Sequence, residues 1–249
     1  MSLLGFFGKK NKLEYTKIPV ESLRIDMHNH ILFGIDDGCK TLDLSMEMVD
    51  KYLAMGFEKV IASPHIMAEG YKNSEATILP PFKAIQEEIE SRNLDLKFEY
   101  AAEYYLDENF EKLLEKGELL GFSGNHVLIE TSIQHAYRGL GNVIFEMGLA
   151  GYQPIWAHPE RYFYMHPRKS DYMKYKDQGA LFQVNLLSFM GQYGPEVKEI
   201  AEWMLEEDLI DLVGTDAHHP RHLDMLNQAQ IPAKLAEKIK AGHLLNARL

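Results

Sequence analysis

A chain of 249 residues, 46% hydrophobic and 25% charged, is long enough to bury a full core and has a usual length for one α/β barrel domain. The formal charge of −11 argues against non-specific nucleic-acid binding, which needs a basic face, and a single cysteine, Cys39, excludes an internal disulfide. With no disulfide possible, we expect a protein of the reduced cytoplasm. No apolar run reaches the roughly 20 residues that span a bilayer.

The chain begins with a short apolar run that is followed by lysines at positions 9, 10 and 12. Positive charges come first in a secretory signal peptide, so this order does not fit one. A weak contact with the inner face of a membrane and an ordinary, loosely held terminus both fit residues 1–12. We treat residues 1–20 as an N-terminal extension and expect the folded domain to span residues 21–249.

Short runs rich in β-branched and aromatic residues alternate along the chain with longer segments of helical periodicity. The seven predicted strands occupy residues 23–27, 59–63, 97–101, 127–129, 153–157, 181–186 and 210–214. Predicted helices follow at residues 42–55, 81–92, 107–116, 142–149, 169–178 and 195–206, and two helical segments close the chain, the last from about residue 232. Thr41 caps the first helix, Gly56 ends it, and Pro195 stands in the first turn of the sixth. Seven strand–helix repeats fit either an open doubly wound sheet or a closed barrel.

Potential metal ligands follow every predicted strand except the sixth. In chain order these residues are His28, His30, Asp37, His65, Glu103, Glu130, His158, Asp216 and His218. The C-terminal ends of the strands of a parallel barrel all meet on one face, whereas an open sheet gathers ligands at a switch point between two strands. Side chains from six strands are easier to gather around a ring, so we favour a seven-stranded barrel with its site at this face.

The ligand types indicate a hydrolytic metal centre. His28 and His30 lie two residues apart at a strand end, so their side chains point the same way and can share one ion. Imidazole and carboxylate ligands without a thiolate suit Mn, Fe or Zn. The number of ligands is too large for one tetrahedral site but fits two or three ions. Two ions bridged by a carboxylate such as Glu103 can lower the pKa of a bound water. They can also hold the attacking and the leaving oxygen of a displacement reaction. The other histidines fit ordinary structural roles: His126, His135, His166, His219, His222 and His243.

These residues resemble the polymerase and histidinol phosphatase (PHP) superfamily, and the likeness covers nearly the whole chain from residue 23. The shared motifs are Asp26-x-His28-x-His30, Pro64-His65, Glu103, His158-Pro-Glu-Arg161 and Asp216-x-His218. Within the superfamily the chain is most similar to the bacterial metal-dependent protein-tyrosine phosphatases of capsule and exopolysaccharide loci. Like those phosphatases, it has Asp37 and Glu130 where histidinol phosphatase relatives often have histidine.

The resemblance implies a distorted seven-stranded (β/α)7 TIM-like barrel with a trinuclear centre. In it the first ion is held by His28, His30, Glu103 and Asp216, the second by Glu103, Glu130 and His158, and the third by Asp37, His65 and His218. Arg161 and Arg221, just beyond the fifth and seventh strands, are expected to bind phosphate as bidentate donors. The implied reaction is hydrolysis of protein phosphotyrosine, and the implied partner is the tyrosine-rich tail of a membrane tyrosine kinase.

Other functions compete with this interpretation. A thiol phosphatase needs a reactive cysteine with an arginine six residues later, but Ser45 stands six residues after Cys39, which excludes the usual arrangement. A small-molecule phosphatase of the histidinol phosphate type stays open, and relative turnover of histidinol phosphate and a phosphotyrosyl peptide would distinguish it. A metal-loaded interaction module without catalysis also stays open, and normal metal content without turnover would identify it.

Overall fold

The computed structural model describes residues 13–249, so the predicted membrane contact through residues 1–12 lies outside the described residues. The strands are β1 Tyr15–Lys17, β2 Ile25–Asp26, β3 Lys59–Ala62, β4 His65–Ile66, β5 Lys97–Tyr100, β6 Glu103–Tyr105, β7 His126–Glu130, β8 Gln153–Ala157, β9 Leu181–Asn185, β10 Leu212–Gly214 and β11 Gln230–Pro232. The helices are α1 Val20–Leu23, α2 Leu42–Met55, α3 Glu75–Ser91, α4 Glu108–Lys116, α5 Leu140–Leu149, α6 Lys169–Asp177, α7 Pro195–Glu206, α8 Pro220–Asn227 and α9 Ala233–Lys240. Short 3₁₀ helices occupy Pro159–Arg161, Leu186–Met190 and Leu245–Arg248.

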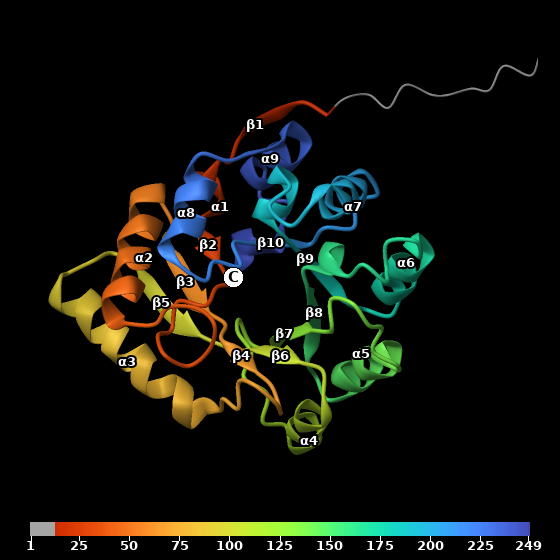
Figure 1. The fold of residues 1–249 in the computed structure, drawn as a ribbon, viewed down its shortest axis with the longest axis horizontal. Helices are drawn as coiled ribbons and strands as arrows, with labels where there is room; N and C mark the ends of the chain where they lie inside the picture. Colours follow the sequence, from red (N-terminus) through yellow and green to blue (C-terminus); the bar gives the residue numbers. More distant parts are fainter. Residues whose placement is uncertain (1–12) are drawn as a thin grey trace, which may run out of the picture.

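The fold is a mixed α/β arrangement of parallel sheets. One sheet has the strand order β2-β3-β5, and a second has the order β10-β9-β8-β7-β6-β4. All pairs within these two sheets are parallel, whereas β1 and β11 form a separate antiparallel pair. Figure 1 shows the strands around a common centre with the larger helices outside them.

The closed seven-stranded barrel is not confirmed, because strand pairing among residues 13–249 stops between the two sheets. The predicted second strand, residues 59–63, corresponds to β3, and Pro64, which has no N–H to donate to a ladder, separates it from β4, a strand that was not predicted. The predicted third strand, residues 97–101, corresponds to β5, and after a gap at residues 101–102 the chain continues as β6, which was also not predicted. On the other side of the ring, one parallel bridge between Asn29 and Ala217 joins the segments that follow β2 and β10.

Most predicted helices are confirmed to within two residues. Thr41 accepts a hydrogen bond from the backbone N–H of Leu44 and caps α2, and α7 spans the predicted residues 195–206. The predicted start of α3 at residue 81 is wrong. This helix begins at Glu75, because Ser74 is its N-cap and the Ser74 N–H donates to Thr77 Oγ1 at 3.0 Å. No helix among the described residues meets the length and apolarity that a bilayer span requires.

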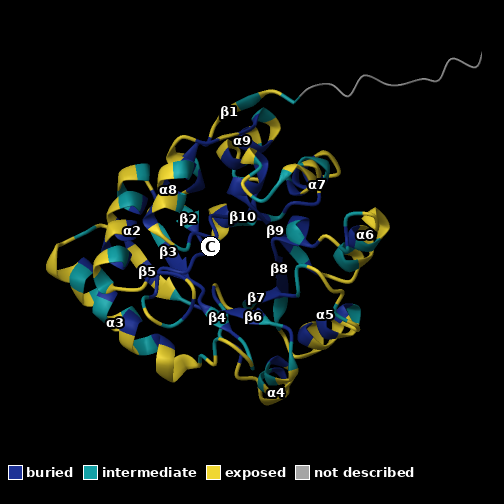
Figure 2. Cartoon of the chain, in the orientation of Figure 1, coloured by how far each residue is buried: buried dark blue, intermediate teal, exposed yellow. Residues whose placement is uncertain are grey.

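Two layers of apolar side chains surround the strands. Within β7, Leu128 belongs to a small inner cluster, whereas its neighbours Val127 and Ile129 belong to the large cluster under the helices. This alternation buries both faces of the strand, as expected for a parallel sheet covered by helices. In Figure 2 the strands are accordingly the most buried elements, and the exposed residues gather on the outer helices.

Candidate metal centre

The residues predicted as metal ligands lie together beyond the C-terminal ends of the strands. Their ligand atoms fall into four groups, and within each group the atoms lie within 4.8 Å of one another. The groups are His30, Asp37, His65 and His218; His28, His30 and Glu103; His28, His158 and Asp216; and His65, Glu103 and Glu130. Because each group shares a residue with another, all the predicted ligands form one continuous set, which we call the ligand cluster.

Glu103 lies at the middle of the ligand cluster. Its Oε2 is 3.2 Å from His28 Nε2, 3.4 Å from His30 Nε2 and 3.2 Å from His65 Nδ1. Its Oε1 is 3.1 Å from His158 Nε2. The side chain is 0% exposed, and a fully buried carboxylate between four imidazoles is well placed to bridge two cations.

His65 is the residue whose position differs from the expected division into three ligand sets. Its Nδ1 lies 3.0 Å from Glu130 Oε1, on the Glu103 side of the ligand cluster, and its Nε2 lies 3.5 Å from Asp37 Oδ1. His65 therefore stands between two groups. His158 also has two sets of neighbours. Its ligand atom is grouped with those of His28 and Asp216, and its Nε2 also faces Glu103.

Several atoms of the ligand cluster are buried without a hydrogen-bond partner. Four of them lie close together, namely His28 Nε2, His30 Nε2, His65 Nδ1 and Glu103 Oε2, and a fifth, His158 Nδ1, belongs to the ring whose Nε2 faces Glu103. Unpaired buried polar atoms are costly and rare in folded proteins. Since these four atoms converge on each other, bound cations would satisfy all of them, and imidazole with carboxylate is a donor set that divalent transition metals accept.

Hydrogen bonds on the far side of the rings orient two of the histidines. His30 Nδ1 is 2.8 Å from Asp36 Oδ2, and His218 Nδ1 is 3.0 Å from the Asp216 carbonyl oxygen. A carboxylate and a carbonyl can only accept, so each Nδ1 carries a proton and each Nε2 faces the ligand cluster. Asp36 also accepts from the backbone N–H groups of Gly38 and His65, which fixes the carboxylate itself.

The charges of the ligand cluster are strongly coupled. Burial alone would lower the pKa of His28, but the carboxylates of Glu103 and Asp216 outweigh it and raise that pKa to about 9. Burial likewise opposes ionisation of Glu103 and Asp216, yet the neighbouring histidines hold both pKa values well below the usual range. In the metal-free protein, the raised pKa of His28 therefore favours a proton that offsets these carboxylates, and a divalent cation could take the place of that proton.

Asp26, the first residue of the Asp26-x-His28-x-His30 motif, points away from the ligand cluster. Its carboxylate accepts from Tyr52 Oη at 2.6 Å and from Thr215 Oγ1 at 2.7 Å. These bonds tie β2 to α2 and to the segment after β10. The aspartate therefore aligns the two chain segments that carry His28, His30, Asp216 and His218.

The backbone around the ligand cluster is tightly constrained. His158 and Asp216 have φ values of 34° and 50°, in the left-handed region that side chains other than glycine rarely occupy. At Gly38 a Cβ atom would lie 2.0 Å from the His30 carbonyl oxygen. Only glycine therefore lets the loop that carries Asp36 and Asp37 pass this close to His30.

The two predicted phosphate-binding arginines lie in different surroundings. Arg161 reaches the ligand cluster, where its Nη1 donates to Asp216 Oδ2 at 2.8 Å and its guanidinium carbon lies 4.3 Å from the centre of the Tyr193 ring. Arg221 is exposed on α8 and is not among the residues that line the cavity at the ligand cluster. The geometry thus places one of the two arginines where a phosphate could meet the metal ligands.

A cavity of about 460 Å³ opens onto the ligand cluster. Besides ligand residues and Arg161, it is lined by Met67, Tyr71, Tyr105, Thr131, Ser132, Ile133 and Gln134. The Tyr71 ring stacks on His65 with the centroids 5.5 Å apart and the planes within 8°. The cavity therefore combines a charged floor with partly aromatic walls.

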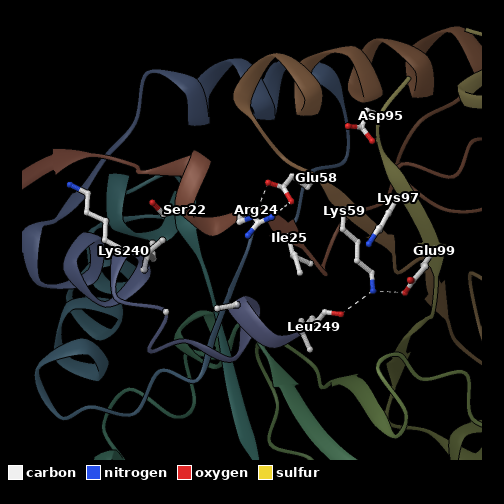
Figure 3. A pocket seen from close by; sticks show the side chains of 13 residues that line it. Ser22, Arg24, Ile25, Glu58, Lys59, Asp95, Lys97, Glu99, Lys240 and Leu249 are labelled. Atoms are coloured by element: carbon white, nitrogen blue, oxygen red, sulfur yellow. Dashed lines mark hydrogen bonds and ion pairs between the residues drawn. The ribbon is translucent and has the colours of Figure 1, made fainter. Parts of the chain in front are cut away.

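A larger cavity of about 610 Å³ lies at the opposite ends of the strands, beside the first residues of β2, β3 and β5. Two of its cations already have partners, as Figure 3 shows: Arg24 is paired with Glu58, and Lys59 is 2.8 Å from Glu99. Lys59 also donates to the Leu249 carbonyl oxygen at 3.0 Å. Among residues 13–249, no group of potential metal ligands lines this cavity, which lies at the other ends of the strands from the ligand cluster.

Sequence reasoning missed the residues that support the ligands. Asp36 was visible only as a neighbour of Asp37. Gln183 and Asn185 lie on β9, the strand with no ligand of its own, and the structure places them against His28 and Asp216. Their signal in the sequence is weak but real, because two polar residues alternate in a strand that is otherwise apolar.

The family model described as "Capsular polysaccharide synthesis, CpsB/CapC" matches residues 24–243 of the chain. The tyrosine-protein phosphatase CpsB of Streptococcus agalactiae serotype V is 28% identical over 201 residues, which are 78% of this chain and 83% of that protein. The tyrosine-protein phosphatase YwqE of Bacillus subtilis is 29% identical over 196 residues, with 78% of this chain and 77% of that protein covered.

A similar solved structure comes from work on YwqE from Bacillus subtilis and CpsB from Streptococcus pneumoniae, which are described as metal-dependent tyrosine phosphatases. It has a TM-score of 0.73 and 26% sequence identity, and the match covers 87% of this chain and 94% of that one. With the family model matching nearly its whole length, this chain belongs to the CpsB/CapC family of capsular polysaccharide synthesis.

Proposed function

We propose that the protein is a metal-dependent phosphatase that hydrolyses phosphotyrosine in protein substrates, with residues 21–249 as its catalytic domain. The observation that carries this proposal is the ligand cluster, whose four buried ligand atoms without partners converge beside an open cavity. The relatives' names support the same reaction, since they are called tyrosine-protein phosphatases.

The donor set fits two or three divalent ions of the Mn, Fe or Zn type. The proposed ligands are the residues of the ligand cluster, with Glu103 as the bridging carboxylate. His65 would contribute at the border between the Glu103–Glu130 group and the Asp37–His218 group. Bound there, the ions would supply an activated water and neutralise the phosphate oxygens.

The chain's own residues would bind and orient the phosphate ester. Arg161 has one nitrogen committed to Asp216, and its remaining N–H groups are available for the phosphate oxygens from the wall of the cavity. Because Arg221 is exposed, its contribution stays a prediction that rests only on its place just beyond the seventh predicted strand. A phenolate leaving group, with a pKa of about 10, needs protonation less than a serine alkoxide does.

The shape of the cavity suits an aryl group above the phosphate. Tyr71 and Met67 follow β4, Tyr105 ends β6, and Ile133 follows β7, so the apolar surface comes from neighbouring strand ends. A substrate ring between these walls would bury apolar area at about 25 cal/mol per Å². Phosphotyrosine offers such a ring, whereas histidinol phosphate offers a polar imidazole on a flexible alkyl chain.

The test is hydrolysis of a phosphotyrosyl peptide by the full chain with Mn²⁺ or Zn²⁺, after chelation, and after the metal is restored. We expect chelation to abolish turnover and metal to restore it. Turnover that persists after exhaustive chelation would contradict the proposal, and faster turnover of histidinol phosphate would replace it with a small-molecule phosphatase.

Two isosteric variants sharpen this experiment. Glu103→Gln removes the bridging carboxylate and should lower turnover by at least about 100-fold. Glu99→Gln changes an exposed carboxylate four residues earlier, at the other end of the same strand region, and should leave turnover unchanged. Equal losses of turnover in both variants would mean that Glu103 affects turnover only by stabilising the fold.

The family's link to capsular polysaccharide synthesis supports a membrane tyrosine kinase tail as the substrate and a cytoplasmic location near the membrane. The apolar and lysine-rich start of the sequence would provide a weak membrane contact. Co-sedimentation with anionic liposomes should therefore fall when residues 1–12 are removed, and equal binding of the two proteins would refute the contact.

A further inference from the structure

β9 carries two buried amide side chains. Gln183 and Asn185 lie two residues apart, so they leave the strand on the same face, and both are 0% exposed. A buried amide is costly unless both its oxygen and its nitrogen are hydrogen-bonded. The two amides therefore need partners at both ends.

The partners are each other and two residues of the ligand cluster. Gln183 Oε1 lies 2.7 Å from His28 Nδ1, and Gln183 Nε2 donates to Asn185 Oδ1 at 2.9 Å. Asn185 Nδ2 donates to Asp216 Oδ2 at 2.6 Å. A continuous row of hydrogen bonds thus runs from the His28 ring to the Asp216 carboxylate.

The direction of every bond in this row follows from the carboxylate at its end. Asp216 can only accept, so Asn185 must turn its NH₂ towards it and its oxygen towards Gln183. Gln183 must then present its NH₂ to Asn185 and its own oxygen to His28. His28 therefore has to donate from Nδ1, which leaves Nε2 as the atom that faces Glu103 and Asp216.

We propose that Gln183 and Asn185 are positioning residues whose hydrogen-bond relay fixes the tautomer of His28 and the orientation of Asp216, so that both bind one metal ion. This inference rests on the proposed metal centre. His28 Nε2 lies 3.5 Å from Asp216 Oδ1, so an ion between these atoms would close a ring with the relay. The two ligands would then be held from both sides.

The surroundings of the relay support this assignment. Asp216 Oδ2 also accepts from Arg161, so this oxygen is occupied by two donors and Oδ1 is left for the ion. On β10, a Cβ atom at Gly214 would lie 2.8 Å from Gln183 Nε2 and 2.9 Å from His28 Cβ. Glycine at this position therefore provides the space that the first half of the relay occupies.

The first test measures Zn²⁺ affinity by chelator competition in Gln183→Leu, Asn185→Leu and the double variant of the full chain. Each single change should weaken binding by about 10–100-fold. Because both changes break one row of bonds, the double variant should lose little more than the worse single variant. Unchanged affinities, or losses that multiply as for independent residues, would overturn the relay.

A matched control is Asn246→Leu. Asn246 is also a buried amide, but it bonds to the backbone of Val213 and Ile25 at the other end of the strands. This variant should lower the melting temperature without changing Zn²⁺ affinity. An equal loss of affinity would show that any buried amide has the same effect and would overturn the specific role of β9.

The second test observes the His28 ring directly by ¹⁵N NMR of the Zn²⁺-loaded wild-type protein. The relay requires a protonated Nδ1 and a metal-bound Nε2, and this readout does not depend on a variant that folds. An unprotonated His28 Nδ1 would overturn the relay while leaving the metal centre intact. Wild-type protein that binds no Zn²⁺ would instead overturn the metal centre on which the relay depends.

Discussion

His28 shows how charge balance in the ligand cluster responds to pH. Glu103 and Asp216 raise its pKa to about 9 in the metal-free protein, above the usual value of 6.5. An ion that binds at Nε2 must displace a proton at any lower pH. Metal binding and protonation therefore compete for the same atom.

We expect the metal-free and metal-loaded proteins to respond to pH in opposite directions. A raised folded-state pKa contributes stability that is complete below about pH 6.5 and is lost as the pH rises to about 9. The melting temperature of the chelated protein should fall across this window, while apparent metal affinity rises by up to about tenfold per pH unit for each displaced proton. Thermal unfolding with and without Zn²⁺ at several pH values measures both. A pH-independent metal affinity would contradict the expected competition.

Cys39 belongs to the core. Its Sγ lies 3.2 Å from Met48 Sδ, and burial raises the pKa of the thiol to about 11. Such a thiol is not a nucleophile at neutral pH. Cys39→Ser should therefore keep wild-type kcat/KM on a phosphotyrosyl peptide, at a stability loss of about 1–3 kcal/mol for the buried hydroxyl. Loss of turnover in a folded, metal-loaded variant would contradict the metal-dependent reaction.

At the scale of elements, the breaks in two strands determine how the ligands meet. Pro64 ends β3, and the two-residue strand β4 then pairs with β6 in a register that sets His65 opposite Glu103. A regular strand would continue the β3–β5 ladder. The separate pairing of β4 and β6 therefore brings these two ligands side by side.

The caps of the outer helices show the same dependence on single residues. Asp107 Oδ1 accepts from the backbone N–H groups of Asn109 and Phe110 at the start of α4, and its Oδ2 accepts from the Ala68 N–H at 2.6 Å. Asp107→Ala should reduce the free energy of unfolding by about 1–2 kcal/mol, measured by urea denaturation, with metal content unchanged. Glu108→Ala in the same turn is the control and should cost only a few tenths of a kcal/mol. Equal losses would mean that Asp107 contributes only its charge.

Local patterns allowed a good prediction of the helices and of the residues that the structure gathers into the ligand cluster. The α7 boundaries follow from Pro195 at the first turn, and the ligands follow from the rule that polar residues at strand ends of a parallel sheet converge. The strand breaks and the β1–β11 pair could not be predicted because they depend on partners that are distant in sequence. The early start of α3 depends on a cap that has no periodic signal in the sequence. Gln183 and Asn185 were missed because an amide becomes recognisable as a support only when His28 and Asp216 lie beside it.

At the scale of the whole molecule, the strands converge on a site where histidines and carboxylates from distant parts of the chain meet. The folded state alone gathers these ligands, so bound metal should stabilise it by mass action. At a free concentration of about 100 Kd, one ion adds about 2.7 kcal/mol to the free energy of unfolding. Urea unfolding with and without Mn²⁺ measures this difference, and Glu103→Gln should reduce it. No stabilisation at saturating metal would mean that the unfolded chain binds the ion equally well.

The bond between Asp26 and Thr215 joins positions 189 residues apart in the chain. During synthesis at about 5–20 residues per second, roughly 10–40 s separate the appearance of these two positions. Throughout that interval a growing chain contains His28 and His30 but not yet Asp216 and His218, which belong to the same ligand cluster. Stable metal uptake should therefore begin only after translation passes His218, and a ribosome stalled earlier would carry a nascent chain without a competent centre.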